Sequence, residues 1–557
     1  MKANPEEKLT CLKQLFGILT AVLLLNGCGV QTPSIPNLVP SESSRAPNYW
    51  CTWYWQNYLV LKGQEVTDPD PEMVFNSETV REQLNEETLF GEGGMAKVML
   101  PMSRGDYYFL IDHGWQDKSW DIPEKDIFFN FIMDTIDFPS YTSLQPKDRI
   151  KKLNDDLKAL GWRGLGLWVR GDIAKEEAVK FVEWSKYAGV EYWKIDGGET
   201  ENAYCYKAKQ KIYHELYLEY VTGSRGPLNT RWDEEGLSCY PSVYAPGIRH
   251  VKGSSGPYIS SEALNILKNS DVFRTYDAVP LLVSTVTMQR IHDLLMQTAG
   301  KPEYVALLNV QDDCNIAAAL GCVVSGMRHP KKTPRMYEGR DFHFQIAGDR
   351  KVDQRLNEMD RFVRWQRIAP PMPAGYGTYK ASRGFLIDKF KFRTGDTWKT
   401  DTWGKMVSQS APAIMVRNLP LPQVKINGEP PYVLASKFPD GAICIATEGR
   451  VKPDDSWYHP RADVSLECGE GNQPIGIFGH YKSLKLCFDK SIPGNTVVWA
   501  QDLLADQAQD ITSRVTLRDN ELIIPGELID EIGTSAATAG DISSPGLVLM
   551  MEDQEGK

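Results

Sequence analysis

Short apolar runs alternate with segments of helical period along roughly the first two thirds of the chain. The apolar runs lie at residues 48–58, 107–112, 164–169, 192–196, 236–240, 272–276 and 304–310. Residues 147–160 carry apolar side chains three or four positions apart and are followed by Gly161, which is typical of an amphipathic helix and its end. The same reasoning predicts helices over 174–188, 202–221 and 286–299.

This alternation indicates βαβ units and therefore a parallel sheet. Seven such strands without a GxGxxG or Walker loop favour a closed (β/α)₈ TIM barrel over a doubly wound sheet. The eighth strand is expected somewhere within residues 317–347. A predicted helix over 352–368 is followed by the Pro-rich stretch 369–374, so we place the barrel domain at 47–375.

Beyond residue 376 the chain changes to short β-like runs separated by Gly, Pro, Asp and Asn. Examples are residues 442–446, 484–488, 496–499 and 521–524. Runs at this spacing predict a C-terminal antiparallel β-sandwich domain over 376–557.

The N-terminus has the pattern of an export signal. Three lysines precede an apolar run at 15–25 that is too short to span a membrane as a helix. The run ends in Leu25-Asn26-Gly27-Cys28, which resembles a bacterial lipobox, so we expect a signal peptide at 1–27, lipidation of Cys28 and a Pro/Ser-rich tether at 28–46. The alternative is an ordinary cleavable signal peptide with an incidental Cys28. The expected location is the cell envelope, with a lipid anchor in the membrane as a periplasmic or outer-membrane lipoprotein.

Composition narrows the possible partners. A net charge of -11 argues against nucleic acid or an anionic membrane surface as the main partner. The sequence contains no CxxC, and its 8 His form no HxxxH or HxH, so we expect neither a metal site nor a cofactor. The 15 Trp and 24 Tyr are compatible with stacking on a carbohydrate, although aromatic residues also fill protein cores.

Carboxylates stand at three predicted strand ends, where barrel enzymes carry their catalytic groups. They are Asp112, Asp196 and Asp277, and Lys194 shares a strand face with Asp196 because side chains alternate with a period of two. Glycoside hydrolysis needs two carboxyl groups around the scissile bond. A separation of about 5–5.5 Å gives retention of configuration and about 6.5–9.5 Å gives inversion.

The order of these motifs resembles the α-galactosidase (melibiase) clan of glycoside hydrolases. Five segments carry the resemblance: Ile111–Trp115, Lys194–Asp196, Leu237–Cys239, Arg274–Asp277 and Asn309–Asp313. The resemblance implies a retaining exo-acting enzyme with Asp196 as nucleophile and Asp277 as general acid/base, with Asp271 as the fallback for the second role. The residues expected to bind substrate are Asp112, His113, Trp115, Lys194, Arg274, Trp53 and Cys239.

Two departures from the pattern bear on the sugar. His113 stands where the clan has a second Asp, and Gly198 stands where a Cys often follows the nucleophile. The sugar that the resemblance implies is terminal α-galactose or a relative such as β-L-arabinopyranose or α-N-acetylgalactosamine. A lipid-anchored glycan-binding protein without catalysis is the alternative from another class, and the lack of clustered His disfavours a metal-dependent hydrolase.

Overall fold

The structure is a computed structural model. It describes residues 35–53, 55–56, 59, 80–117, 130–171, 173, 175–196, 203–221, 248–250, 257–259, 269–274, 283–284, 313–326, 355–372, 377–391, 406–452 and 457–554. The chain divides into two compact units, Met1–Asn37 and Leu38–Lys557, and every contact given below lies within the second unit. In the part that the structure describes, no helix is long and apolar enough to cross a membrane. The predicted signal peptide and Cys28 lie outside the described residues.

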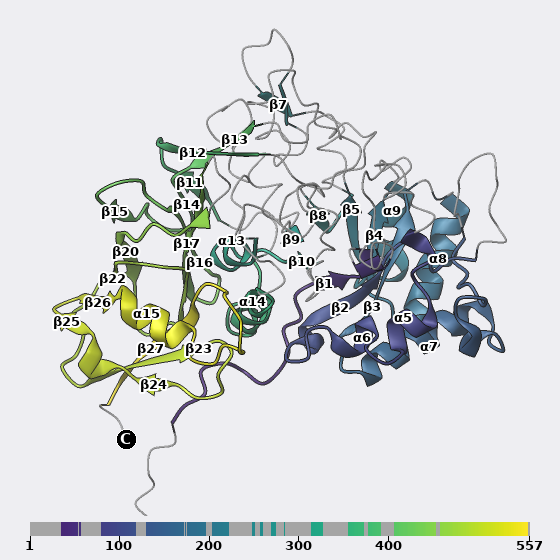
Figure 1. Cartoon of the computed structure of the whole chain (residues 1–557), viewed down its shortest axis with the longest axis horizontal. Helices are drawn as coiled ribbons and strands as arrows, with labels where there is room; N and C mark the ends of the chain where they lie inside the picture. The colour runs from purple at the N-terminus through teal and green to yellow at the C-terminus, as the bar shows by residue number, and fades with distance from the viewer. Residues whose placement is uncertain are drawn as a thin grey trace, which may run out of the picture. The chain divides into compact units, whose positions relative to one another are not determined.

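A mainly parallel sheet carries the predicted strand ends. Its strand order is β8-β5-β4-β3-β2-β1-β10-β9, and only the pair of β9 and β10 is antiparallel. The strands are β1 (Asn48–Cys51), β2 (Tyr107–Ile111), β3 (Gly164–Arg170), β4 (Tyr192–Asp196), β5 (Tyr217–Val221), β8 (Val272–Arg274), β9 (Val283–Ser284) and β10 (Ser325–Gly326). Figure 1 shows the sheet from β1 to β5 with helices α7, α8 and α9 beside it.

The strand order is the one that a (β/α)₈ barrel requires over seven of its strands. Strand β10 pairs with β1 and lies within the range expected for the unplaced eighth strand. The predicted seventh strand, at 304–310, lies outside the described residues, and within those residues the sheet edges β8 and β9 are not paired. The structure therefore shows a curled parallel half-barrel sheet, and a fully closed barrel remains a prediction.

The helices confirm three predictions, one of them by α14 (Asn357–Ile368) within the range 352–368, and correct a fourth. Helices α7 (Pro146–Ala159) and α8 (Lys175–Ala188) lie where helices were expected, and each is followed by a glycine with positive φ, Gly161 at 93° and Gly189 at 68°. The helix predicted over 202–221 is wrong in its second half, because α9 (Ala203–Ile212) ends early and β5 follows it. Strand β5 fills the place between β4 and β8, which the prediction gave to residues 236–240. Those residues lie outside the described part.

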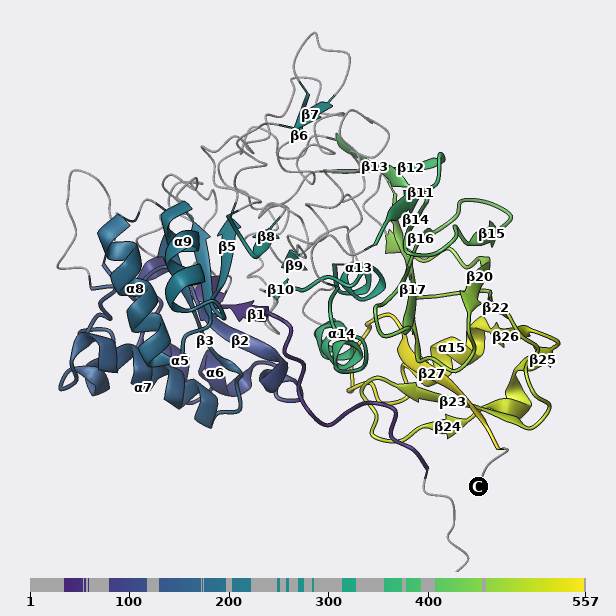
Figure 2. The ribbon, with the colours of Figure 1, turned by 180° about the vertical axis from the view of Figure 1, so that it is seen from behind.

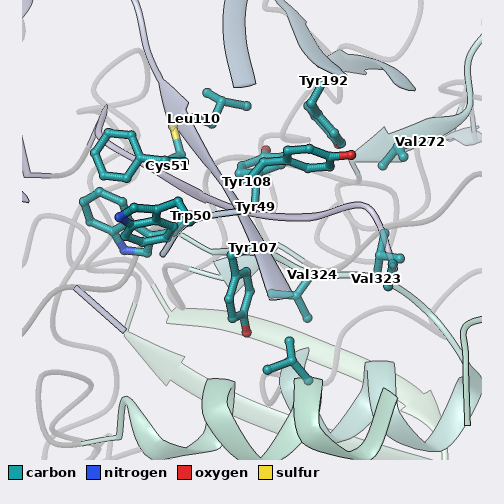
Figure 3. Close-up of a cluster of buried hydrophobic side chains, with 14 of the residues drawn as sticks. Tyr49, Trp50, Cys51, Tyr107, Tyr108, Leu110, Tyr192, Val272, Val323 and Val324 are labelled. Carbon is teal, nitrogen blue, oxygen red and sulfur yellow. The ribbon is translucent and has the colours of Figure 1, made fainter. Parts of the chain in front are cut away.

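Side chains on the two faces of the parallel sheet make different contacts. On the helix-facing side, the indole Nε1 of Trp193 donates to Ser185 Oγ of α8 at 3.0 Å. On the opposite face, the Tyr192 ring lies 5.1 Å from the ring of Tyr49 and 5.7 Å from that of Tyr108. Figure 3 shows these three tyrosines close to one another in the buried cluster. Since the side-chain period is two, Lys194 follows Tyr192 on this inner face.

Two further sheets form the C-terminal part of the chain. The larger has the order β11-β14-β16-β17-β21-β27-β23-β24 and the smaller β15-β20-β22-β26-β25. Their strands are β11 (Tyr379–Ala381), β14 (Ile414–Arg417), β16 (Tyr432–Lys437), β17 (Ile443–Glu448), β21 (Ile475–Phe478), β23 (Thr496–Asp502), β24 (Gln509–Asp510) and β27 (Gly546–Asp553), and β15 (Gln423–Lys425), β20 (Asp463–Gly469), β22 (Ser483–Phe488), β25 (Thr516–Arg518) and β26 (Glu521–Pro525). Apolar side chains of both sheets belong to one buried cluster.

The four example runs named for this region are confirmed as strands, but the prediction of a wholly antiparallel domain is wrong. The pairs β14–β16, β17–β21 and β20–β22 are parallel, so both sheets are mixed. Parallel neighbours need a crossover connection, and β15, which belongs to the other sheet, lies in the connection from β14 to β16. A regular antiparallel sandwich is not what the structure shows.

Helices α13 (Asp313–Leu320) and α14 (Asn357–Ile368) contact each other and the larger C-terminal sheet. Figure 2 shows them side by side next to strand β17. The remaining elements are α5 (Glu86–Phe90), α6 (Met95–Val98), α15 (Gly526–Gly533), the 3₁₀ turns Arg104–Asp106, Pro139–Tyr141 and Thr512–Arg514, and the strand pairs β6 (Ile248–His250) with β7 (Pro257–Ile259), β12 (Phe385–Lys391) with β13 (Met406–Pro412) and β18 (Arg450–Val451) with β19 (Trp457–Tyr458).

Candidate active site

Asp112 directly follows β2 and is held by three strands or strand ends. Its Oδ2 accepts from Lys194 Nζ at 2.5 Å and from Cys51 Sγ at 3.0 Å. Its Oδ1 accepts from the backbone N–H of His113 at 2.8 Å, and its own backbone N–H donates to Thr52 Oγ1 at 2.9 Å. Three hydrogen bonds, from β1, β4 and the residue after Asp112, therefore orient the carboxylate, and a fourth holds its backbone.

The Lys194–Asp112 ion pair is buried, with each residue 2% exposed. Burial by itself raises the pKa of Asp112, but the charge of Lys194 and the donated hydrogen bonds outweigh it, so the pKa lies below its ordinary value. Asp112 is therefore ionised at neutral pH. A buried pair of this kind is costly to desolvate and adds little net stability, but breaking it leaves an uncompensated charge.

Strand register brings this pair next to Asp196. Lys194 lies opposite Trp168 of β3, and Asp196, the last residue of β4, lies opposite Arg170. The period of two predicts the same strand face for Lys194 and Asp196. The structure describes the backbone of Asp196 and not its side chain, so its role as nucleophile remains a prediction.

His113, Trp168 and Trp115 form a cluster of rings beside Asp112, called the wall below. The imidazole of His113 stacks on Trp168 with ring centroids 4.1 Å apart and an interplanar angle of 14°. Trp115 is buried and donates from Nε1 to the backbone oxygen of Trp168 at 3.0 Å, so it supports the wall from behind. Burial, followed by the charge of Arg81, lowers the pKa of His113 well below its usual range. His113 is therefore neutral and does not replace the charge of an Asp.

Gly114 explains how Arg81 comes to lie against this wall. Its φ is 123°, and a Cβ added there would lie 2.5 Å from the backbone oxygen of Arg81. The glycine thus permits the segment around Arg81 to approach the turn after β2 closely. Arg81 Nη1 then lies 3.5 Å from His113 Nε2, and Gln56 Nε2 donates to the backbone oxygens of Val80 and His113 at 3.2 and 3.0 Å.

Glu219 is a buried carboxylate that the sequence did not reveal. It lies on β5 opposite Lys194 and accepts from the hydroxyls of Tyr49 at 2.9 Å and Tyr192 at 2.5 Å. These tyrosines precede Cys51 and Lys194 by two residues, so their hydroxyls hold Glu219 toward the amino ends of the strands. The prediction missed it because β5 was assigned to a helix, in which alternate residues do not share a face.

The remaining predicted residues fall into two groups. Trp53 is half-buried and packs on the main apolar core, and the backbone of Arg274 ends β8 opposite Val221. Asp277 and Cys239 lie outside the described residues, as does most of the 309–313 motif. Within the described ranges, no three His, Cys, Asp or Glu side chains lie together as metal ligands would.

Asp271, the fallback for the acid/base, lies at the wrong end of its strand. It precedes β8, whereas Asp112 and Asp196 lie at the carboxyl ends of strands that run parallel to β8. Its Oδ2 accepts from Lys209 Nζ at 2.7 Å and from the backbone N–H of Leu218 at 2.9 Å. These contacts join α9 to β5, so Asp271 has a structural role and the fallback is wrong.

Comparison of the whole chain with known proteins finds only low similarity. The sequence matches no protein-family model and no curated protein. Among solved structures it is similar to α-galactosidase I from Mortierella vinacea, with 10% identity, 92% of this chain and 97% of that chain covered, and a TM-score of 0.32. It is also similar to a GH27 β-L-arabinopyranosidase from Geobacillus stearothermophilus in complex with arabinose, with 11% identity, 92% and 97% coverage, and a TM-score of 0.28.

A third similar structure is the α-galactosidase from Saccharomyces cerevisiae with raffinose, with 9% identity, 93% and 100% coverage, and a TM-score of 0.32. With TM-scores this low, neither the fold nor the substrate of this chain is deduced from the three structures. The three structures are two α-galactosidases and one β-L-arabinopyranosidase, and the resemblance of this chain to the α-galactosidase clan rests on the motifs of its sequence.

Proposed function

We propose that this protein is an exported, retaining exo-glycoside hydrolase of α-galactosidase type. The observation that carries the proposal is the buried Lys194–Asp112 pair, held at the carboxyl ends of β2 and β4 on the face that Asp196 shares. Charged groups are buried at a cost, and such a pair at the mouth of a parallel sheet is typical of a site that binds a polar ligand.

In the proposed reaction, Asp196 attacks the anomeric carbon and forms a glycosyl-enzyme ester while Asp277 protonates the departing oxygen. Water then attacks the anomeric carbon from the face that the aglycone left, opposite the ester, and displaces Asp196, with Asp277 now accepting the proton of the water. Lys194 and Asp112 bind the hydroxyls of the sugar, Lys194 as donor and Asp112 as acceptor. The positive charge of Lys194 also favours the ionised form of Asp196.

The first experiment measures hydrolysis of nitrophenyl glycosides of α-galactose, β-L-arabinopyranose and α-N-acetylgalactosamine. The wild-type protein should cleave at least one of them, and Asp196→Ala should lower kcat by roughly 10⁴-fold, as loss of one catalytic residue does elsewhere. Asp155→Ala, on the exposed side of α7, is the matched control. Near-normal turnover by Asp196→Ala would remove Asp196 from the mechanism.

A second experiment tests Asp277. Loss of a general acid matters least when the leaving group is already a good one, so Asp277→Ala should retain far more of its rate on nitrophenyl glycosides than on a natural disaccharide. The ratio of the two losses is the readout. Equal losses on both substrates would contradict the acid/base role.

The proposal also includes export and lipid anchoring at Cys28. The basis is the signal-peptide pattern and the lipobox-like Leu25–Cys28. In a bacterial host that processes lipoproteins, the protein should fractionate with membranes, and Cys28→Ser should release it into the soluble fraction. Equal membrane association of both forms would argue against the anchor.

A further inference from the structure

We propose that Gln56 is a positioning residue of the candidate active site, which fixes the carboxylate of Asp112 in the orientation that binds a sugar hydroxyl. Gln56 acts through Thr52 and through the backbone of His113. Its side chain is completely buried, so it orients the site without touching the substrate. The inference rests on the proposed function, because it concerns how that site binds its sugar. It adds a residue that neither the motifs of the sequence nor the proposed reaction contains.

The contact between Gln56 and Thr52 arises in one helical turn after β1. The backbone N–H of Gln56 donates to the carbonyl oxygen of Thr52 at 2.9 Å, and residues four apart in such a turn lie on the same face. The Thr52 hydroxyl therefore reaches the Gln56 amide and donates to Oε1 at 2.7 Å. The same hydroxyl accepts from the backbone N–H of Asp112 at 2.9 Å. Because its proton is directed to Gln56, its lone pairs are left to face Asp112.

The nitrogen of the Gln56 amide lies between two backbone carbonyls. Nε2 donates to the oxygen of Val80 at 3.2 Å and to that of His113 at 3.0 Å. Two carbonyl acceptors require both N–H groups of an amide nitrogen, and the hydroxyl proton of Thr52 requires the amide oxygen. Among side chains, only Gln and the shorter Asn offer this combination of donors and acceptor. One buried amide thus joins the end of β1, the segment at Val80 and the turn after β2.

These hydrogen bonds fix the backbone on both sides of the Asp112 carboxylate. Thr52 holds the N–H of Asp112, and Gln56 holds the carbonyl of His113. Between them lies the N–H of His113, which donates to Asp112 Oδ1 at 2.8 Å. A shift of this turn would move the carboxylate away from Lys194 and from the bound sugar. Misplacement of a group in an active site by about 1 Å can cost roughly 100-fold in rate.

The test measures KM and kcat of Gln56→Met on the nitrophenyl glycoside that the wild-type protein cleaves best. Methionine keeps the length of the side chain and removes its hydrogen bonds. KM should rise by about tenfold or more while kcat changes little, because the weakened contact binds ground state and transition state alike. Thr52→Val should act in the same way, and Thr52→Ser, which keeps the hydroxyl, should retain a KM close to that of the wild type. An unchanged KM in Gln56→Met would overturn the inference.

Gln366→Met is the matched control for a purely structural role. Gln366 is a buried residue of α14, and its Nε2 donates to the backbone oxygen of Cys322 at 2.8 Å while its Oε1 accepts from Asn48 Nδ2 at 2.6 Å. Asn48 begins β1, so these contacts lie at the other end of the strand from Asp112. Both Gln→Met variants should lower the melting temperature, but only Gln56→Met should raise KM. Equal increases in KM would contradict the inference.

Thermal melts show which variants are folded. If Gln56→Met does not fold, the comparison of Thr52→Val with Thr52→Ser decides, because both variants keep the amide of Gln56 and only one keeps the hydroxyl that it orients. A raised KM in Thr52→Val alone supports the inference. The same KM in both Thr52 variants would overturn it.

Calorimetric titration with free galactose, L-arabinose and N-acetylgalactosamine separates this inference from the proposed function. If no glycoside is hydrolysed but one sugar binds, and Gln56→Met weakens that binding while Gln366→Met does not, the hydrolase proposal fails and the inference stands. If glycosides are hydrolysed and Gln56→Met has the KM and the sugar affinity of the wild type, the hydrolase proposal stands and the inference fails. If no sugar is bound or hydrolysed, both are overturned.

Discussion

At the scale of single residues, the Lys194–Asp112 pair makes stability depend on pH in a defined direction. The pKa of Asp112 lies below its ordinary value of 3.8 in the folded protein, because Lys194 and the hydrogen-bond donors outweigh burial. Its contribution to folding is therefore present above pH 4 and is lost as the pH falls through the lowered pKa. Asp112→Asn should remove this dependence and cost about 3–5 kcal/mol at pH 7, because the buried charge of Lys194 loses the opposite charge of Asp112.

Chemical denaturation of wild-type protein and Asp112→Asn between pH 3 and 7 measures this effect. The difference in unfolding free energy should be largest at pH 7 and shrink as the solution is acidified. Asp155→Asn on the exposed side of α7 serves as the control for loss of one carboxylate. A difference that is constant across this range would contradict the buried ion pair.

Gly114 gives a second prediction at the residue scale. Gly114→Ala places a Cβ 2.5 Å from the Arg81 backbone oxygen at a φ of 123°, whereas Gly161→Ala has a comparable φ of 93° and no atom within 4 Å. Both substitutions carry a backbone cost of about 1–3 kcal/mol, but only the first adds a clash. Thermal melts should show a larger loss for Gly114→Ala, together with weaker sugar binding. Equal losses would contradict the close approach of Arg81.

The site residues that could be predicted from the sequence are those at the ends of predicted strands. Asp112 and Lys194 were predicted to bind the same substrate, and the structure brings them into direct contact. Cys51 was not singled out, because nothing in the aromatic segment around it indicates that its thiol contacts the carboxylate of Asp112, which lies 61 residues later in the sequence. Arg81 was missed for a similar reason, because its approach to His113 depends on a long-range fold contact.

At the scale of elements, α14 carries a prediction of its own. Asp360 on this helix is buried and accepts a hydrogen bond from Ser103, and burial followed by the charge of Asp106 raises its pKa from 3.8 to about 6. The folded protein then binds a proton more tightly than the unfolded chain, so stability falls as the pH rises from 4 to 6. At 1.36 kcal/mol for each pKa unit, this cost is about 3 kcal/mol above pH 6.

Asp360→Asn keeps an oxygen that can accept from Ser103 and removes the charge. It should therefore raise the unfolding free energy by up to about 3 kcal/mol at pH 7.5 and change it little at pH 4. Asp502→Asn is the matched contrast, because Asp502 pairs with the buried Arg361 at 3.1 and 3.3 Å and should be destabilising when neutralised. Loss of stability in Asp360→Asn at pH 7.5 would contradict the raised pKa.

The helix predicted over 202–221 is wrong in its second half because the sequence carries no local signal of where the helix ends. No Gly or Pro stands between the end of α9 and the start of β5, so the usual residues that mark a helix end or a turn are absent there. What makes residues 217–221 a strand is pairing with β4 and β8, which are distant in sequence. Tertiary context of this kind overrides local propensity. The helices α7 and α8 were predictable because their apolar period and terminal glycines are local.

At the scale of the whole molecule, helix α14 links the parallel sheet to the C-terminal strands. Arg367 makes two hydrogen bonds to Asp106, just before β2, at 3.0 and 2.6 Å. Arg361 pairs with Asp502 at the end of β23. Residues 38–557 form one compact unit, and contacts of this kind lie within it. The domain boundary after α14 stays a prediction.

We therefore expect one cooperative calorimetric transition for the wild-type protein. Arg361→Gln removes the partner of a buried carboxylate and should cost about 3–5 kcal/mol, either lowering the transition temperature or splitting the transition in two. Arg518→Gln, which removes an exposed charge, is the control. Two separate transitions in the wild-type protein would contradict the linkage through α14.

The central claim is that Asp196 is the nucleophile of a retaining glycoside hydrolase. The most direct test is to incubate the protein with an activated 2-deoxy-2-fluoro glycoside of a cleaved sugar, which slows the second step so that the glycosyl-enzyme ester accumulates, and to map the label by peptide mass spectrometry. The account predicts one sugar per protein, on Asp196, and none in Asp196→Ala. Hydrolysis of the parent glycoside with the label on another residue would contradict it.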